Sequence, residues 1–308
     1  MEPNPVSTTT PLFSIIIGVY NDWTALDQCL RSLEQQINGP SFEVIVVDDG
    51  SNQPAPDVIL VWSRRLSLTV IRQSHAGIPS ARNRGIQVSR GSVLLFVDAD
   101  SRTQSGCLEA LAATIADSPR HDCFQLRLVG DCSGPIGRAE ELRLRTFQQH
   151  MLQPDGRIRY LNTAGFAIRR ASVNINEDLF NPVALRAEDT LLLANLMQRG
   201  ELPLFVANAT VQHAIPLSFI ECVLKDIRSA YLEGRTYDII ESKGVKIRVS
   251  NRERLRMLSS MWKVAGQPPI GRWAWFVLVA RQTVQRILSF GFGCLPTRPK
   301  TQISPNSA

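Results

Sequence analysis

The chain has 308 residues, of which 44% are hydrophobic and 20% are charged. This length is sufficient for one large α/β domain with an appendage, and this composition excludes an intrinsically disordered protein. The formal net charge of +6 is unevenly placed, because residues 221–308 carry 15 Lys and Arg against 6 Asp and Glu.

The first residues are polar and proline-rich, without the basic start and apolar stretch of a signal peptide. The cysteines are Cys29, Cys107, Cys123, Cys132, Cys222 and Cys294. They form no Cys-x-x-Cys pair, so a zinc site built on such a pair is unsupported. Because a chain of this length can bury a good core without disulfides, we expect reduced thiols and a cytoplasmic location.

The first element is predicted at residues 12–19, where a continuous apolar run rich in β-branched residues is typical of a strand buried on both faces. Apolar residues then recur at helical spacing, which predicts a helix over 24–37 with Thr24 as its cap. The same patterns predict strands at 42–47, 68–72, 93–97 and 123–129, and helices at 78–89 and around 108–115.

This alternation of strands and helices predicts an α/β fold, with a mostly parallel, Rossmann-like central sheet flanked by helices. Later helices are expected within 138–160 and at 188–199, 218–233, 251–265 and 272–290, with an extended stretch at 206–213. We therefore expect a catalytic domain over 12–215, a boundary near Pro216 and a C-terminal helical extension over 216–295. Frayed tails are expected at 1–11 and 296–308.

Polar clusters follow three of the predicted strands, at the edge of the sheet where such folds bind ligands. The clusters are Tyr20-Asn21-Asp22, Asp48-Asp49-Gly50-Ser51 and Asp98-Ala99-Asp100-Ser101. Their convergence on one crevice is a stronger indication of a site than any one cluster.

The Asp98-Ala99-Asp100 cluster has the spacing of a metal site. Alternate residues leaving a strand can present two carboxylates to one ligand, and Mg²⁺ and Mn²⁺ prefer oxygen ligands and also take phosphate oxygens. Such a metal would neutralise a diphosphate leaving group. The alternative is a solvated turn, but the buried strand before the cluster favours the metal site.

Four other features have both a structural and a functional interpretation. Asp48 and Asp49 suit a turn and also a ribose or base contact. Residues 75–85 combine a glycine loop, a helix start and two arginines, which suits a phosphate or a surface helix. Glu188 and Asp189 are ordinary acidic residues for the start of a helix. The functional interpretation is that one of these carboxylates, Asp189, is a general base near the crevice. For His213 we expect a structural role, with contact to a metal or a phosphate as the minority alternative.

Together, five segments resemble the inverting family 2 glycosyltransferases, which have the GT-A fold. The matching segments are SIIIGVYND at 14–22, EVIVVDDGS at 43–51, HAGIPSARNRGI at 75–86, VLLFVDADS at 93–101 and AEDTLL at 187–192. Their order and spacing also match, and the resemblance covers about residues 12–215. It implies transfer of a sugar from a nucleoside diphosphate sugar, most of all a UDP-sugar, to an acceptor hydroxyl with inversion.

The resemblance also implies roles for donor-site residues. Tyr20 would lie against the base, Asp48 and Asp49 would contact base and ribose, and Arg82 would face the nucleotide. Gly165 departs from the family pattern, because a polar residue is usual at that position of the segment lining the acceptor side.

For the chemistry, the resemblance implies a metal-binding DxD at Asp98 and Asp100, with Asp100 as the more direct ligand of Mn²⁺ or Mg²⁺. Asp98 would also contact the donor. Asp189 matches the catalytic base, and His213 lies where some relatives place a histidine near the metal and diphosphate. Ser101 stands where a third Asp is frequent.

Two other functions are alternatives to this one. A sugar nucleotidyltransferase would need a glycine-rich, basic loop after the first strand, which VYNDW is not. A catalytically inactive nucleotide-sugar-binding protein would not need Asp98, Asp100 and Asp189.

The expected acceptor is a saccharide or a lipid-linked molecule, as in polysaccharide or glycolipid biosynthesis, and no nucleic acid is expected as a partner. Residues 270–290 combine Trp and Phe with Arg, which is typical of interfacial helices. Their apolar run is too short to cross a bilayer. We therefore expect peripheral contact with the inner membrane face, or else a helix that packs on the catalytic domain.

Overall fold

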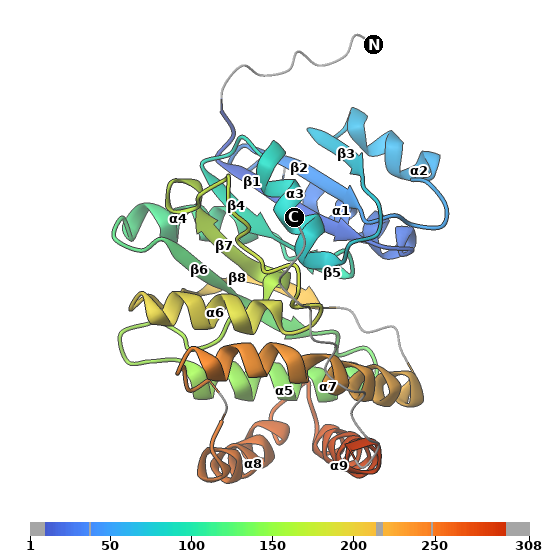
Figure 1. The fold of residues 1–308 in the computed structure, drawn as a ribbon, viewed down its shortest axis with the longest axis vertical. Coiled ribbons are helices and arrows are strands. Elements are labelled where there is room, and N and C mark those ends of the chain that lie inside the picture. The colour runs from blue at the N-terminus through green and yellow to red at the C-terminus, as the bar shows by residue number, and fades with distance from the viewer. Residues whose placement is uncertain (1–9, 37, 214–217, 248, 294–308) are drawn as a thin grey trace, which may run out of the picture.

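The computed structural model describes residues 10–36, 38–213, 218–247 and 249–293. Eight strands form one sheet in the order β3-β2-β1-β4-β7-β6-β8-β5. The strands are β1 (Phe13–Val19), β2 (Phe42–Asp48), β3 (Leu68–Arg72), β4 (Val93–Phe96), β5 (Ser101–Thr103), β6 (Cys123–Gly130), β7 (Phe166–Arg169) and β8 (Leu204–His213). This sheet, flanked by helices, confirms the predicted α/β fold (Figure 1).

Parallel pairing brings the carboxyl ends of β1, β2 and β4 to one edge of the sheet. Strand β1 pairs in parallel with both β2 and β4, and β2 pairs in parallel with β3. Strand β6 is parallel to β8, whereas β7 runs antiparallel to β4 and β6, and β5 runs antiparallel to β8. Parallel pairs thus outnumber antiparallel ones by four to three, and the polar clusters after β1, β2 and β4 meet as predicted.

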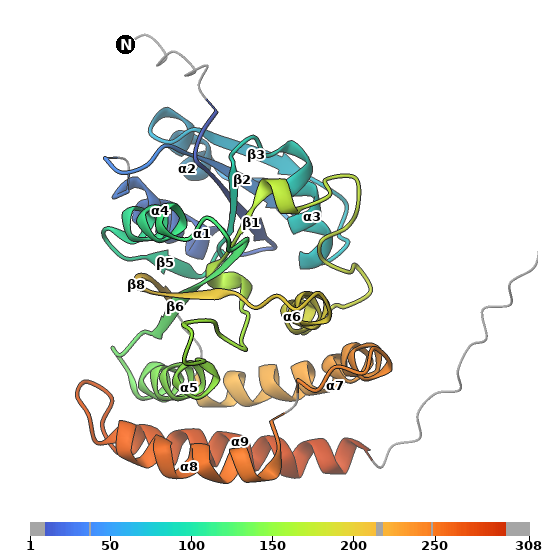
Figure 2. The ribbon, with the colours of Figure 1, turned by 90° about the vertical axis from the view of Figure 1, so that its left-hand side faces the viewer.

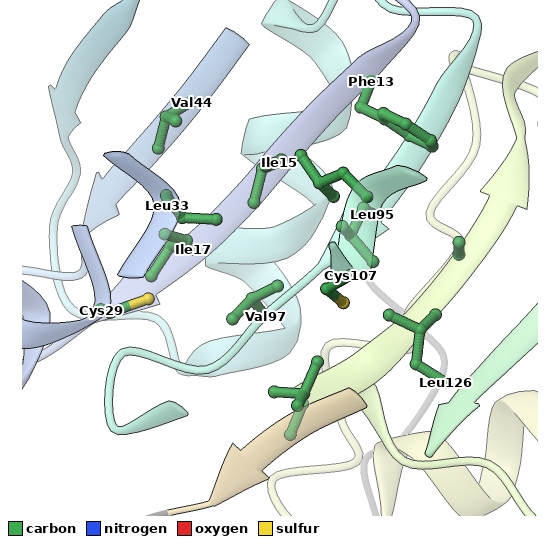
Figure 3. Packing of buried hydrophobic residues seen from close by; sticks show 14 of the residues in the cluster. Phe13, Ile15, Ile17, Cys29, Leu33, Val44, Leu95, Val97, Cys107 and Leu126 are labelled. Carbon is green, nitrogen blue, oxygen red and sulfur yellow. The ribbon is translucent and has the colours of Figure 1, made fainter. Parts of the chain in front are cut away.

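The main core forms where β1 packs against helix α1 (Trp23–Glu34) on one face of the sheet. Alternate residues of β1, among them Ile15 and Ile17, point to this face and lie close to Cys29 and Leu33 of α1 (Figure 3). Because every residue of β1 apart from Gly18 is buried, this strand is a rigid base for the polar residues that follow it.

Helices cover both faces of the sheet close to the strand ends. They are α1, α2 (Asp57–Leu60), α3 (Ile78–Val88), α4 (Cys107–Asp117) and α6 (Glu188–Gln198), with short 3₁₀ turns at Val61–Arg64, Thr163–Gly165 and Arg170–Ser172. One predicted cap was wrong, because helix α1 begins one residue earlier. Asp22, not Thr24, is its cap, and the Asp22 carboxylate accepts a hydrogen bond from the Ala25 amide.

Four helices lie beyond the sheet as two further layers. Helices α5 (Pro135–Met151) and α7 (Phe219–Ser242) form the nearer layer, and α8 (Asn251–Ala265) and α9 (Trp273–Gly293) form the outermost one (Figure 2). A small core joins α5, α8 and α9, in which Ala139 and Leu142 of α5 pack with Met257 and Met261 of α8 and Leu278 of α9. The C-terminal helical region thus packs on α5, which belongs to the predicted catalytic segment.

Several predictions fall on residues outside the described ranges. The predicted boundary at Pro216, Ile37 of the first helix, Cys294 and nearly all of both predicted tails lie there. The five other cysteines are free thiols, as expected. Among the described helices, none is long and apolar enough to cross a membrane.

Candidate active site

A cavity of about 1620 Å³ opens at the carboxyl ends of β1 and β4. It extends from this edge of the sheet to α5, α7, α8 and α9. Among its lining residues are six of the predicted site residues: Tyr20, Arg82, Asp98, Asp100, Asp189 and His213. Two predicted donor residues, Asp48 and Asp49, are not among those that line it.

Asp98, Asp100 and His213 form one cluster at the end of β4. One potential ligand atom of each lies within 4.8 Å of the others. Pairing of β5 with β8 places Ser101 opposite His213, which brings the histidine from the end of β8 to the acidic pair. His213 Nε2 lies 3.4 Å from Asp100 Oδ2. The structure therefore joins residues that are more than 100 positions apart in the sequence.

The charges of this cluster favour the ionised carboxylate. Burial alone would raise the pKa of Asp100, but the hydrogen bond and charge of His213, and then the charge of Lys225 on α7, hold it below its usual range. Burial would likewise lower the pKa of His213, but Asp100 raises it. Two carboxylates and an imidazole together suit Mn²⁺. The carboxylate oxygens are also suitable ligands for Mg²⁺.

Asp49 is almost fully buried and holds the loop that leads into α3. Its two carboxylate oxygens accept hydrogen bonds from the backbone amides of Ala76 and Gly77, both at 2.9 Å, and from the Gln73 side chain at 2.8 Å. Asp48 similarly accepts a hydrogen bond from the Ser51 amide at 2.8 Å. Both side chains thus shape the loops after β2, and their predicted contacts with a donor stay a prediction.

Tyr20 forms an aromatic surface at the mouth of the cavity. Its ring is 43% exposed and stacks on the His75 ring, with centroids 4.3 Å apart and an interplanar angle of 27°. The turn after Tyr20 is held by Asn21, which has a positive φ of 57° and whose backbone amide donates a hydrogen bond to Ser51 Oγ. Such strain in a residue other than glycine is typical of functional sites. This surface suits a planar base.

Arg82 joins the cluster after β4 to the start of α6. Its guanidinium is buried and donates to Asp98 Oδ1 at 2.8 Å and to Glu188 Oε1 at 2.5 Å. The resemblance implies that Arg82 faces the nucleotide, and in the structure one N–H group of each terminal guanidinium nitrogen donates to these two carboxylates, while Arg82 also lines the cavity. A nucleotide contact by Arg82 stays a prediction.

Asp189 lies at the opening of α6, next to Glu188. Burial, and then the charge of Glu188, raise the pKa of the Asp189 carboxyl to about 7. Ala187, the residue before α6, has a left-handed backbone with φ of 56°, and such strain in a residue other than glycine is often found at functional sites. A carboxyl group with a pKa near neutrality is suited to general acid–base chemistry.

Sequence reasoning missed a buried charge network on the far side of the cavity. Glu140 and Arg143 of α5 form a bidentate pair, and Arg281 of α9 binds Asp226 of α7 at 2.5 and 2.7 Å. Arg143 holds the pKa of Glu140 at about 2 in spite of its burial. The three-residue spacing of Glu140 and Arg143 could have indicated their pairing, but no local signal connects Asp226 with Arg281.

The departure at Gly165 has a steric reason. A Cβ atom at this position would approach Leu128 Cδ2 of β6 to 2.9 Å and Leu126 Cβ to 3.3 Å. Gly165 therefore lets the turn before β7 pack closely against β6, and a larger residue would require the Leu128 side chain to shift.

Comparisons with known proteins agree with this arrangement. The family model described as glycosyl transferase family 2 matches residues 14–176, which is more than half of the chain. Among curated relatives, a putative glycosyltransferase of Bacillus subtilis (strain 168), EpsH, is 33% identical over 109 residues, which is 35% of this chain and 31% of that protein. The match thus spans about a third of the length of this relative.

Solved structures show the same fold at lower sequence identity. Residues 1–349 of Staphylococcus aureus TarS in complex with UDP match with a TM-score of 0.55 and 20% identity, covering 91% of both chains. The mannosyltransferase PcManGT of Pyrobaculum calidifontis, in complex with GDP-Man and Mn²⁺, matches with a TM-score of 0.61 and 15% identity, covering 94% of this chain and 89% of that one. At these identities the likeness establishes the GT-A fold.

Proposed function

The chain belongs to glycosyl transferase family 2, and we propose that it transfers a sugar from a nucleoside diphosphate sugar to an acceptor hydroxyl with inversion of configuration. One observation carries this proposal. Asp189, a carboxyl group with a pKa of about 7, lines the same cavity as the Asp98, Asp100 and His213 cluster. A base and a potential diphosphate-binding centre thus face a common space.

Asp189 is the proposed general base. It removes the proton from the acceptor hydroxyl, whose oxygen attacks the anomeric carbon from the face opposite the leaving group, through an oxocarbenium-like transition state. Arg82 and Glu188 hold the start of α6, and therefore Asp189, at a fixed position relative to Asp98. This direct displacement would invert the configuration.

Asp98, Asp100 and His213 are the proposed holders of Mn²⁺ or Mg²⁺. Their donor atoms fit such an ion, because they are close together and are oxygen- and nitrogen-based. A bound divalent cation would act as a Lewis acid that stabilises charge on the diphosphate leaving group. The Lys225 side chain, which lines the same cavity, adds a positive charge near Asp100.

The donor is proposed to be a UDP-sugar, with its base on Tyr20. The TarS structure contains UDP and a related one contains UDP-GlcNAc, whereas PcManGT contains GDP-Man. Nucleotide release from a panel of UDP- and GDP-sugars with Mn²⁺ tests this proposal. We expect release from a UDP-sugar in the intact protein, and a product of inverted anomeric configuration by NMR when an acceptor is supplied.

Nucleotide release, together with the melting temperature and the products formed, distinguishes a glycosyltransferase from the two alternative functions. An inactive nucleotide-sugar-binding protein would show a donor-dependent rise in melting temperature without nucleotide release. A sugar nucleotidyltransferase would instead form a nucleotide sugar from a sugar phosphate and a nucleoside triphosphate. Either outcome would refute the proposal.

A peripheral site at the inner membrane face is the proposed location of the enzyme. The outermost helices α8 and α9 carry exposed apolar residues, which we name the outer apolar patch: Leu255, Leu258, Trp262, Trp273 and Phe276. Basic residues surround this patch, and the Arg272 guanidinium lies 5.2 Å from the centre of the Trp262 ring. Aromatic and basic side chains together suit an anionic lipid surface. The alternative, in which this helix packs on the catalytic domain, agrees with the packing of Leu278 on α5, but that packing leaves Trp273, which is 80% exposed, in contact with solvent.

A further inference from the structure

The cavity is larger than a nucleotide sugar requires. Ligand pockets are usually about 300–1,000 Å³, whereas this one is about 1620 Å³. The donor site predicted from Tyr20, Asp98 and Asp100 lies at the sheet edge, so the remaining space lies beyond Asp189, towards α5 and α7. This second part of the cavity is where an acceptor has room.

Helix α7 presents one continuous polar face to this space. The residues of α7 that line the cavity are Cys222, Lys225, Asp226, Ser229, Glu233 and Tyr237, at spacings of one, three and four residues. Such spacing places them on a single side of a helix. The helix is therefore a wall of the cavity along most of its length.

Two contacts fix this wall on either side of its centre. Asp226 binds Arg281 of α9, and Thr236 Oγ1 donates to the Arg186 carbonyl, just before α6, at 2.6 Å. Ser229 and Glu233 lie between these anchors. Within the described residues neither makes a hydrogen bond, so their polar groups are available to a ligand.

Glu233 and Tyr160 line the same cavity as the proposed base, Asp189. Burial raises the pKa of Glu233, which also senses the charges of Arg186 and Glu188. Burial raises the pKa of Tyr160 as well, and the Asp189 charge contributes to that rise. The Tyr160 ring is held edge-on against Phe147 of α5, with centroids 5.4 Å apart. An aromatic ring, a hydroxyl and a carboxylate therefore line the space next to Asp189.

We propose that the acceptor is a saccharide, bound by Tyr160 and by the Ser229 and Glu233 side chains of α7. A carboxylate and a hydroxyl can accept and donate several hydrogen bonds to adjacent sugar hydroxyls. An aromatic ring offers its apolar face to the C–H groups of a sugar ring. A purely apolar acceptor would instead leave the Glu233 carboxylate desolvated and unpaired, which is costly. This inference rests on the proposed glycosyl transfer.

The test uses the full chain, Mn²⁺, a UDP-sugar that it hydrolyses, and methyl glycosides of common hexoses as acceptors. We expect at least one glycoside to accept the sugar, and Glu233→Gln to raise the KM for that glycoside about tenfold, as for a lost hydrogen bond to a charged group. Ser229→Ala should raise it less, and the KM for the donor should stay unchanged. Asp238→Asn, a matched change on the exposed face of α7, should alter neither KM.

Each outcome has a distinct meaning. Absence of donor hydrolysis in the native chain would refute the proposed function, and with it this inference. Hydrolysis without transfer to any glycoside, or transfer to octanol in preference to glycosides, would refute the saccharide acceptor alone. An unchanged glycoside KM in Glu233→Gln, or an equal rise in Asp238→Asn, would refute the role of the α7 face.

Discussion

Arg82 and Glu188, which are 106 residues apart, are joined by a hydrogen bond of 2.5 Å at the candidate active site. The same guanidinium also binds Asp98. Because Glu188 directly precedes Asp189, this one arginine links the acidic cluster after β4 to the residue proposed as the base. The link has consequences for both the position and the pKa of Asp189.

The first prediction concerns pH. A general base must be ionised, so we expect kcat to fall with decreasing pH around the raised pKa of Asp189, about 7. The negative charge of Glu188 contributes to that rise, so Glu188→Gln should lower the pKa of Asp189 and move the acid limb of the profile to lower pH. Profiles of kcat for both proteins measure this shift. An unmoved limb, or one that moves upwards, would contradict it.

The second prediction concerns the base itself. Asp189→Asn keeps the shape of the side chain but cannot take a proton, so turnover should fall by roughly two to four orders of magnitude. The KM of the donor should change little. Steady-state kinetics with the active donor measure both quantities. A collapse of donor binding would instead show that Asp189 is a donor ligand.

The third prediction concerns the metal. Asp100→Ala should abolish transfer and Mn²⁺ binding without unfolding the chain, because Asp100 lies in the cavity and not in the apolar core. Calorimetric titration with Mn²⁺, alongside the melting temperature, separates the two effects. Full activity of the native chain in excess EDTA would contradict the metal site.

The fourth prediction concerns Asp49, whose carboxylate supports the loop before α3. Asp49→Ala would leave the amides of Ala76 and Gly77 without their acceptor, which should cost about 3 kcal/mol of the free energy of unfolding. Denaturant unfolding measures this loss. The exposed Asp57→Ala is the matched control. Equal stability of Asp49→Ala and the native chain would show that the loop does not depend on this carboxylate.

Local patterns were sufficient to predict the residues that follow fully buried strands. Asp98 and Asp100 could be predicted because the buried strand before them has an unmistakable apolar pattern and ends at the sheet edge. Strands β5 and β7 could not, since neither is buried along its whole length and both are held by antiparallel pairing with strands that are distant in the sequence.

Long-range contacts limited the prediction of the site. Arg82 was recognised, but its partners Asp98 and Glu188 come together only through the packing of α3 and α6 on the sheet. The bond between Asp226 and Arg281 likewise depends on how α7 and α9 pack, 55 residues apart. No periodicity or motif within either helix encodes such a contact.

The last prediction concerns the outer apolar patch. Trp273 is 80% exposed and Phe276 is 49% exposed, so the double variant Trp273→Ser, Phe276→Ser removes apolar area from the surface without opening the core. If the patch enters the interface of an anionic bilayer, this loss should reduce binding to vesicles rich in phosphatidylglycerol by about tenfold or more. Binding of the native chain should also weaken with salt, because the surrounding Arg and Lys residues contribute electrostatically.

Co-sedimentation with vesicles measures this effect, and α2 offers the control. Val58 is 48% exposed and Val61, at the start of the 3₁₀ turn after α2, is 46% exposed, yet both lie far from α8 and α9 in the fold (Figure 1). Val58→Ser, Val61→Ser should therefore leave vesicle binding as it is. If the native chain stays in the supernatant with anionic vesicles at low salt, the membrane contact is refuted. If both double variants lose binding equally, the contact does not depend on this patch, and the aromatic cluster of α8 and α9 serves only the packing of the two helices against each other.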